Sequence, residues 1–178
     1  MVWPGKKRQI DELVEAHYRR LFAFAYRLSG SSQEAEDLTQ ETFCQAQAKL
    51  DQLRDWERAQ SWLFSILRNA YLHKVRAAKK MNLVSTDDIG DLPDRLPETL
   101  PEVDPEKLQQ VLNELPESWR TPLILFYFED FSYRDIADQM NVPLGTIMSR
   151  LARAKAFLRS RLVEPGAVAL VLGPREGK

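Results

Sequence analysis

The sequence predicts an all-α protein built from two small helical domains that are joined by an acidic, proline-rich linker. Apolar residues recur at intervals of three and four along most of the chain, which is the spacing of one helix face, and no convincing strand-like alternation is present. The segment DIGDLPDRLPETLPEVDP holds four regularly spaced prolines among acidic residues. Because proline and concentrated negative charge oppose both a helix and a packed core, this segment divides the chain.

These features set the expected domain boundaries, and a length of 178 residues suits two domains of this kind. Asp104 followed by Pro105 is a favourable start for the second domain, because Asp caps a helix and Pro is tolerated at its first position. We expect a first helical domain at 8–80, the linker at 81–104, a second helical domain at 105–163 and a tail at 164–178. The tail fits a disordered end and a small docking segment equally well.

The composition excludes several classes of protein. The single cysteine, Cys44, rules out an intramolecular disulfide and fits a reducing cytosol. The N-terminal residues do not form a secretory signal, and the late apolar run AVALVL is too short to span a bilayer. The sequence has two histidines and no metal-ligand cluster, glycine-rich phosphate loop or nucleophile–base spacing. We therefore expect a cytoplasmic protein without membrane insertion, catalytic residues, cofactor or bound metal.

The segment YRDIADQMNVPLGTIMSRLARAKAFLRSRL predicts a helix-turn-helix. Ser132 followed by Asp135 has the spacing of a capping box and predicts a helix through about Met140. Asn141 tolerates the left-handed conformation of a tight turn, and Pro143 favours the start of a second helix. That helix is expected to bury one apolar stripe, made of Ile147, Leu151, Ala154, Leu158 and Leu162.

The charge of this second helix contrasts with the rest of the chain. The whole chain has a net charge of −1, and residues 87–106 hold eight acids against one arginine. Residues 143–163 have no acid and carry five bases, namely Arg150, Arg153, Lys155, Arg159 and Arg161. The second helix of a helix-turn-helix enters the major groove, where Arg reads guanine edges and Ser or Thr suits phosphates and bases. The pattern therefore favours DNA binding over a solvated basic face.

Motifs in both domains point to one family. In the second domain, LPESWRTPLILFYFEDFSYRDIADQMNVPLGTIMSRLARAKAFL resembles the fourth region of bacterial sigma factors of the extracytoplasmic-function type (ECF, group IV). In the first domain, EAEDLTQETF resembles the D-L-x-Q-E-x-F segment of that family, and SWLFSILRNAYLHKVRAAKK resembles its W-L-x-x-I-x-R-N helix. One motif set per domain, in the order of the family, covers residues 11–163.

The resemblance implies a promoter-specificity subunit with no chemistry of its own. Such a subunit binds core RNA polymerase at the β′ clamp helices and the β flap, reads the −10 and −35 promoter elements, and assists melting of the DNA. Many relatives are held inactive by an anti-sigma factor, which makes such a protein a further candidate partner. The alternatives are a stand-alone dimeric helix-turn-helix regulator and a helical adaptor that binds only protein. The near-neutral net charge counts against the first and the acid-free helix against the second.

The resemblance also assigns the protein-docking residues. On a helix, the D-L-x-Q-E segment has Asp37, Gln40, Glu41 and Cys44 on one polar face, and Ala35, Leu38, Thr42 and Ala46 towards another. An acidic and amide face is a poor DNA surface but a good protein-docking surface. The residues expected to bind polymerase are Asp37, Gln40, Glu41 and Phe43.

For the −10 element, the resemblance assigns the W-L-x-x-I-x-R-N helix and the preceding loop LRDWERAQ. Basic residues beside aromatic ones suit a melted single strand, because the phosphates pair with Lys or Arg side chains and the nucleobases stack on the aromatic rings. Trp56 fits a pocket for an extruded base and a core position equally well, whereas Trp62 is expected in the core with Leu63 and Leu67. The expected −10 residues are Trp56, Arg68, Asn69, His73, Arg76, Lys79 and Lys80. The expected −35 residues are Thr146, Ser149, Arg150, Arg153 and Lys155.

The sequence departs from the family pattern at a few positions. His73 stands where the family often has Asp, and Met148 replaces a commonly basic residue, which removes one phosphate contact and bears on −35 preference. Pro122 falls in the early turns of an expected helix and predicts a mild kink. The acidic linker fits two interpretations equally, a mimic of nucleic acid in polymerase channels and a solvated spacer.

Overall fold

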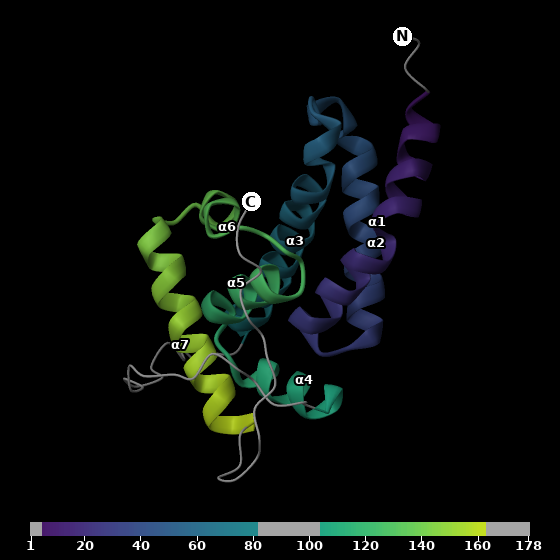
Figure 1. Ribbon diagram of the computed structural model, residues 1–178. Coiled ribbons are helices and arrows are strands. Elements are labelled where there is room, and N and C mark those ends of the chain that lie inside the picture. Colours follow the sequence, from purple (N-terminus) through teal and green to yellow (C-terminus); the bar gives the residue numbers. More distant parts are fainter. Residues whose placement is uncertain (1–4, 82–103, 163–178) are drawn as a thin grey trace. The chain divides into compact units, whose positions relative to one another are not determined.

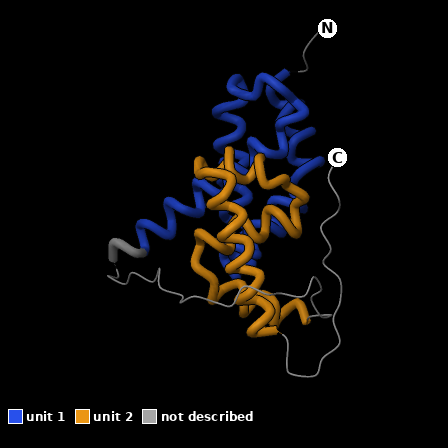
Figure 2. The backbone as a smooth tube through the Cα atoms, turned by 60° about the vertical axis from the view of Figure 1, so that its left-hand side comes forward, with its two compact units in different colours: residues 1–85 blue, residues 86–178 orange. Residues whose placement is uncertain are grey.

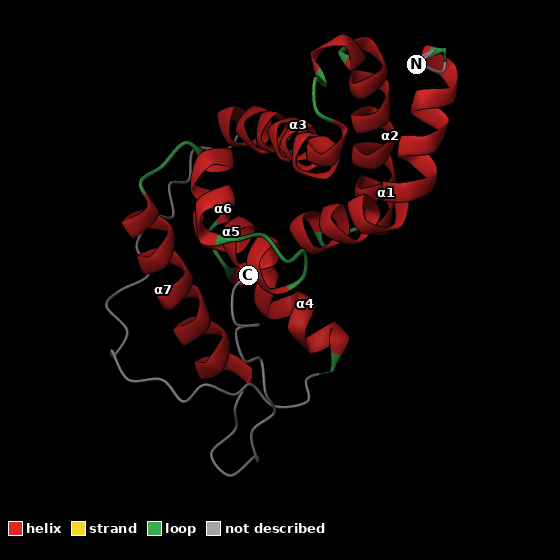
Figure 3. Cartoon of the chain, turned by 45° about the horizontal axis from the view of Figure 1, so that its top comes forward, coloured by secondary structure: helices red, strands yellow, loops and turns green. Residues whose placement is uncertain are grey.

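The computed structural model describes residues 5–81 and 104–162, and within these ranges the chain forms helices and connecting loops without a β-strand (Figures 1 and 3). The all-α class is therefore confirmed. The chain divides into two compact units, Met1–Ser85 and Thr86–Lys178, which we call unit 1 and unit 2 (Figure 2). The expected linker and tail lie outside the described residues, except for Met81 and Asp104. Along the described ranges, no helix has the length and apolar character needed to cross a membrane.

Unit 1 is built from α1 (Lys6–Ser29), α2 (Ser32–Ala48) and α3 (Ala59–Met81), with the short 3-10 helices η1 (Leu50–Gln52) and η2 (Trp56–Arg58) before α3. Gly30 ends α1 in the left-handed conformation, with φ of 73°, and its N–H donates to the Tyr26 carbonyl. Ser31 then caps α2, because its hydroxyl accepts from the Glu34 N–H at 3.3 Å. Glycine adopts this turn without strain, so the chain reverses and α2 packs against α1.

The three long helices of unit 1 enclose one core. Phe24 of α1 and Phe64 of α3 are fully buried with their ring centroids 4.9 Å apart, and burial of such a side chain contributes roughly 1.5–3 kcal/mol. The Tyr71 hydroxyl crosses from α3 to donate to the Leu28 carbonyl at 2.9 Å. Leu63 and Leu67 are buried as expected. Trp62 is only half-buried, so the prediction of a core position was wrong in part: the ring lies at the edge of the core.

Unit 2 consists of α4 (Pro105–Glu114), α5 (Glu117–Tyr127), α6 (Tyr133–Met140) and α7 (Leu144–Leu162), and α7 packs against the other three. The predicted start of α4 is confirmed, because Pro105 is its first residue and the Asp104 carboxylate accepts from the Glu106 N–H at 3.2 Å. Pro122 lies inside α5 and is buried.

The predicted helix-turn-helix is formed by α6, a short turn and α7. Ser132 and Asp135 make the expected capping box, and Asn141 ends α6 in the left-handed conformation, with φ of 52°. Pro143 precedes the helix instead of opening it, since α7 begins at Leu144 and the Pro143 carbonyl accepts from the Thr146 N–H at 2.9 Å. The apolar stripe of α7 is buried as predicted, at Ile147, Leu151, Ala154, Leu158 and Leu162.

Candidate docking and nucleic-acid surfaces

The expected docking face lies on α2 of unit 1. Asp37, Gln40 and Cys44 are exposed, and Glu41 is half-buried beside them. The other side of the helix faces the core and is fully buried, at Ala35, Leu38, Thr42 and Ala46. The two buried threonines on this helix stay satisfied, because the Thr39 and Thr42 hydroxyls donate to the carbonyls four residues earlier at 2.7 and 2.6 Å. A helix fixed along one side in this way presents its polar side as a firm surface.

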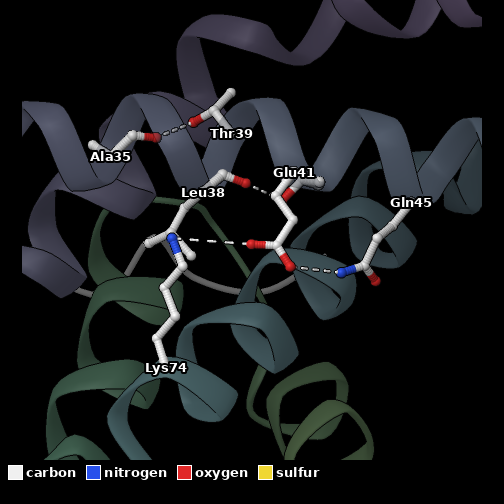
Figure 4. A network of polar contacts seen from close by, with 7 residues as sticks. Ala35, Leu38, Thr39, Glu41, Gln45 and Lys74 are labelled. Carbon is white, nitrogen blue, oxygen red and sulfur yellow. Dashed lines mark hydrogen bonds and ion pairs between the residues drawn. The ribbon is translucent and has the colours of Figure 1, made fainter. Parts of the chain in front are cut away.

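Glu41 lies at the centre of a small polar network that links α2 to α3 (Figure 4). One carboxylate oxygen accepts from the Gln45 side-chain amide at 3.0 Å, and the other lies 4.0 Å from the Lys74 ammonium of α3. Both partners of this ion pair remain partly exposed, so the pair contributes at most about 1 kcal/mol. Weak pairing holds the Glu41 carboxylate in place and leaves it accessible to a partner.

Phe43 differs from the other expected docking residues because it is buried. It is only 9% exposed, and its ring lies nearly parallel to that of Tyr18 on α1, with centroids 6.4 Å apart. Tyr18 itself is exposed and lies beside Phe22 one helical turn later. An approaching protein would therefore meet Tyr18 at this edge. The sequence analysis did not single out Tyr18, although the i, i+4 spacing of two aromatic residues was a signal for it.

The residues expected to bind the −10 element lie on η2 and α3. Trp56 is 40% exposed, which excludes the core alternative for this ring. Asp55 fixes the start of η2, since its carboxylate accepts from the Glu57 N–H at 3.0 Å, and Trp56 is thereby held at the surface. The structure does not describe the side chains of Lys79 and Lys80.

α3 has a continuous polar face along its second half. Asn69, His73 and Arg76 are exposed at spacings of four and three, which places them on one side of the helix, and Arg68 is half-buried next to them. The α3 sequence contains five basic residues and no acidic one. This helix therefore combines a positive surface with hydrogen-bonding groups, which suits the sugar-phosphate backbone and unpaired bases.

The residues expected to bind the −35 element lie on α7 of unit 2. Ser149 and Arg153 are exposed, whereas Thr146, Arg150 and Lys155 are half-buried along the flanks. The Ser149 hydroxyl donates to the Thr146 carbonyl at 3.0 Å. All five residues belong to the acid-free helix, so they give unit 2 a basic strip beside its buried stripe.

The C-terminal end of α7 serves the packing of unit 2. Arg161 forms an ion pair with Glu114 of α4 at 3.3 Å and lies over the Phe157 ring at 5.3 Å. Arg159 lies near Tyr127, whose pKa is raised by burial and lowered in part by this positive charge. The base-reading role is therefore expected in the first half of α7. Sequence analysis left Arg159 and Arg161 out of the −35 set but counted them in the basic surface, because charge alone does not reveal which residues contact α4 and α5.

Across residues 5–81 and 104–162, no group of three or more His, Cys, Asp or Glu side chains is placed to hold a metal ion. His17 on α1 has its pKa lowered by burial and by the nearby Arg20 charge. The surfaces described above suit binding.

Comparison with known proteins gives the same division of the chain. Residues 13–81 match the family model of sigma-70 region 2, and residues 106–158 match that of sigma-70 region 4. The ECF RNA polymerase sigma factor SigE of Mycolicibacterium smegmatis is 34% identical over 159 residues, which are 86% of this chain and 62% of that protein. SigM of Bacillus subtilis is 31% identical over 153 residues, which are 85% of this chain and 93% of that protein.

Solved structures extend the likeness to the fold. The sigma factor RpoE of Bartonella quintana, in complex with the anti-sigma factor NepR, is 30% identical and superposes with a TM-score of 0.66, covering 86% of this chain and 94% of that one. CnrH, in complex with the cytosolic domain of CnrY, shares the fold at 21% identity and a TM-score of 0.62, with 88% of each chain covered.

Proposed function

The chain belongs to the ECF RNA polymerase sigma factors and carries sigma-70 regions 2 and 4, and from this premise we propose how its surfaces divide the recognition of a promoter. As a member of this family it directs RNA polymerase to promoters and is a non-catalytic subunit. Residues 8–80 act as the region 2 domain, residues 105–163 as the region 4 domain, and the acidic segment 81–104 as their connector. The chain works in the cytoplasm, where its polymerase and promoter DNA are found.

The polar face of α2 binds the β′ clamp helices of core RNA polymerase. Asp37, Gln40 and Glu41 supply this contact, and Phe43 supports it from the layer below through Tyr18. The acidic and amide character of the exposed residues supports this assignment, because the face repels DNA and suits a protein surface. The region 4 domain docks on the β flap.

The surface of η2 and α3 holds the melted −10 element. Trp56 stacks on an unpaired nucleobase, and Asn69 and His73 contact nucleobase edges. The phosphates pair with four basic side chains, Arg68, Arg76, Lys79 and Lys80. The exposure of Trp56 supports this role, because a ring held at the surface can stack on a base. Extruding that base costs a few kcal/mol, which stacking in the protein offsets.

The part of α7 from Thr146 to Lys155 reads the −35 element from the major groove. Thr146, Ser149, Arg150, Arg153 and Lys155 supply the contacts. The observation that carries the whole proposal is the division of charge between surfaces: the docking face of α2 is acidic, whereas α3 and α7, the helices assigned to DNA, contain no acidic residue. A stand-alone dimeric helix-turn-helix regulator would use α7 to bind DNA but would assign no binding partner to the polar face of α2.

A small inhibitory protein is a further partner. The RpoE structure contains an anti-sigma factor, and the present chain is 30% identical to that sigma factor over most of its length. We propose that an anti-sigma factor of this kind occupies the docking face of α2 and the reading face of α7, which would block both polymerase and DNA.

The test is promoter binding with and without core RNA polymerase at fixed salt, on a pool of promoter-like duplexes. Specific binding and strand opening only with polymerase support the proposal. Asp37→Ala and Gln40→Ala should weaken polymerase binding, whereas Glu15→Ala on the exposed surface of α1 should not. Arg153→Ala should weaken −35 binding, with Arg19→Ala as the control for loss of one exposed positive charge. Tight, sequence-specific binding by the chain alone, unchanged by polymerase, would contradict the proposal.

A further inference from the structure

Two exposed aliphatic side chains stand out at the start of α7. Leu144 is 45% exposed and Met148 is 52% exposed. The other large hydrophobic residues that are exposed in the described part of the chain are Tyr or Trp, which carry a polar group. A solvated tyrosine or tryptophan needs no explanation, whereas two adjacent aliphatic side chains leave apolar surface in water at a free-energy cost. Their exposure therefore indicates a contact with a molecule outside unit 2.

The local geometry makes these two side chains one patch. Residues four apart in a helix lie one above the other, so Leu144 and Met148 share one side of the first two turns of α7. Gly145 lies between them in sequence, and a Cβ atom added there would meet nothing within 4 Å. The N-terminal end of the helix is thus open, and a neighbouring molecule can approach its backbone closely.

We propose that Leu144 and Met148 read a thymine in the −35 element by enclosing its C5-methyl group. This inference rests on the proposed role of α7 as the reading helix. The N-terminal residues of such a helix contact base edges in the major groove, and thymine is the base that presents a methyl group there. The flexible thioether of Met148 adapts to the position of the methyl, and Leu144 closes the other side.

The surroundings favour DNA over a protein as the occupant. Ser149 and Arg150 follow Met148 directly, and the helix has no acidic residue, so the patch is continuous with a surface suited to phosphates and base edges. A protein-docking patch usually covers several hundred Å² of apolar surface, and two side chains fall short of that. A single methyl group matches their size.

The experiment uses holoenzyme reconstituted from the full chain and core RNA polymerase. A library with a randomised −35 region is selected for binding, and each thymine of the selected element is then replaced by deoxyuridine, which lacks only the methyl group. At one position we expect binding to weaken about fourfold, the value for burial of one carbon group. Met148→Ala and Leu144→Ala should remove this difference between thymine and uracil, and Met148→Leu should retain it.

A second readout separates methyl recognition from a general loss of binding. Met148 carries no charge, so Met148→Ala should leave the salt dependence of binding unchanged, whereas Arg153→Ala should reduce the slope of log K against log salt by about 1. The side chains of Met148 and Arg153 are both exposed, so the variants should retain their helices, which circular dichroism measures directly.

Three results would overturn the inference: a selected −35 element without an A·T pair, equal binding of thymine and uracil at every position, or a thymine preference that survives alanine at both residues. In the last case the apolar patch faces something other than DNA, such as a protein partner. These results differ from failure of the proposed function, in which the holoenzyme would show no dependence on the −35 sequence at all.

Discussion

Removal of the Ser132 hydroxyl tests whether α6, which packs against the reading helix α7, depends on its N-terminal cap. In the capping box that opens α6, the Ser132 hydroxyl accepts from the Asp135 N–H at 3.1 Å, and the Asp135 carboxylate accepts from the Ser132 N–H at 3.2 Å. α6 has eight residues and packs against both α5 and α7. A helix this short gains little free energy from cooperative propagation, so the hydrogen bonds at its ends make a large contribution to its stability.

The expected cost of Ser132→Ala is about 1 kcal/mol, which is typical for loss of an N-cap side chain. The value is not larger because Ser132 and Asp135 are exposed, so water replaces the lost partner. Local opening of α6 should become about fivefold more frequent, since each 1.4 kcal/mol is a factor of ten. The buried Ile136 ties this opening to the packing of α7, so −35 binding should weaken as well.

The assay is hydrogen exchange followed by mass spectrometry, with separate peptides from α6 and α3. Ser132→Ala should accelerate exchange in α6 and leave α3 of unit 1 unchanged. Ser160→Ala is the matched control, because its hydroxyl donates to the Phe157 carbonyl within α7, caps no helix and is not among the −35 residues. Unaltered exchange in α6, or equal acceleration in α3, would refute the reasoning.

Three further outcomes are expected. Gly145→Ala should raise the melting temperature, because the new Cβ meets nothing within 4 Å and Ala stabilises a helix by about 0.5 kcal/mol relative to Gly. The same variant should weaken −35 binding in a holoenzyme assay, because the added methyl group occupies space through which DNA approaches this turn. Lys74→Ala should change the free energy of unfolding by less than about 1 kcal/mol in urea titrations, since its pair with Glu41 is half-exposed; a larger loss would mean a structural pair. The lowered pKa of His17, caused by burial and by Arg20, makes the unfolded state the stronger proton binder, so unit 1 should lose stability as the pH falls below the ordinary histidine value of 6.5; His17→Gln should flatten this dependence.

Features governed by local rules were predictable from the sequence. A Ser–Asp spacing of three defines a capping box, and Asn at a helix end tolerates positive φ, so both ends of α6 followed from its own residues. The polar side of α2 followed in the same way from the helical period, because Ala35 and Leu38 are buried and Asp37 is exposed.

Features that depend on neighbouring helices were not predictable. The sequence left Trp56 between surface and core, and Phe43 was grouped with polar residues although it lies against Tyr18 of another helix. Leu144 shows the same limit, because its spacing of seven from Leu151 puts it in line with the buried stripe. Periodicity identifies the side of a helix, but only the fold shows that Leu144, the first residue of α7, is 45% exposed.

The electrostatics of α7 limit how tightly the chain alone should bind a promoter. The helix has five bases, but Arg161 is paired with Glu114 and Arg159 lies beside Tyr127, which leaves Arg150, Arg153 and Lys155 for phosphates. With a slope near 0.9 per phosphate, three contacts lose roughly 40-fold in affinity between 50 and 200 mM salt. Because the affinity of α7 for DNA falls so steeply with salt, we expect the helix to discriminate among sequences but not to retain DNA by itself. The acidic face of α2 cannot add phosphate contacts either, so we infer that it anchors the chain to a protein, and that affinity comes through that anchor while α7 supplies selectivity.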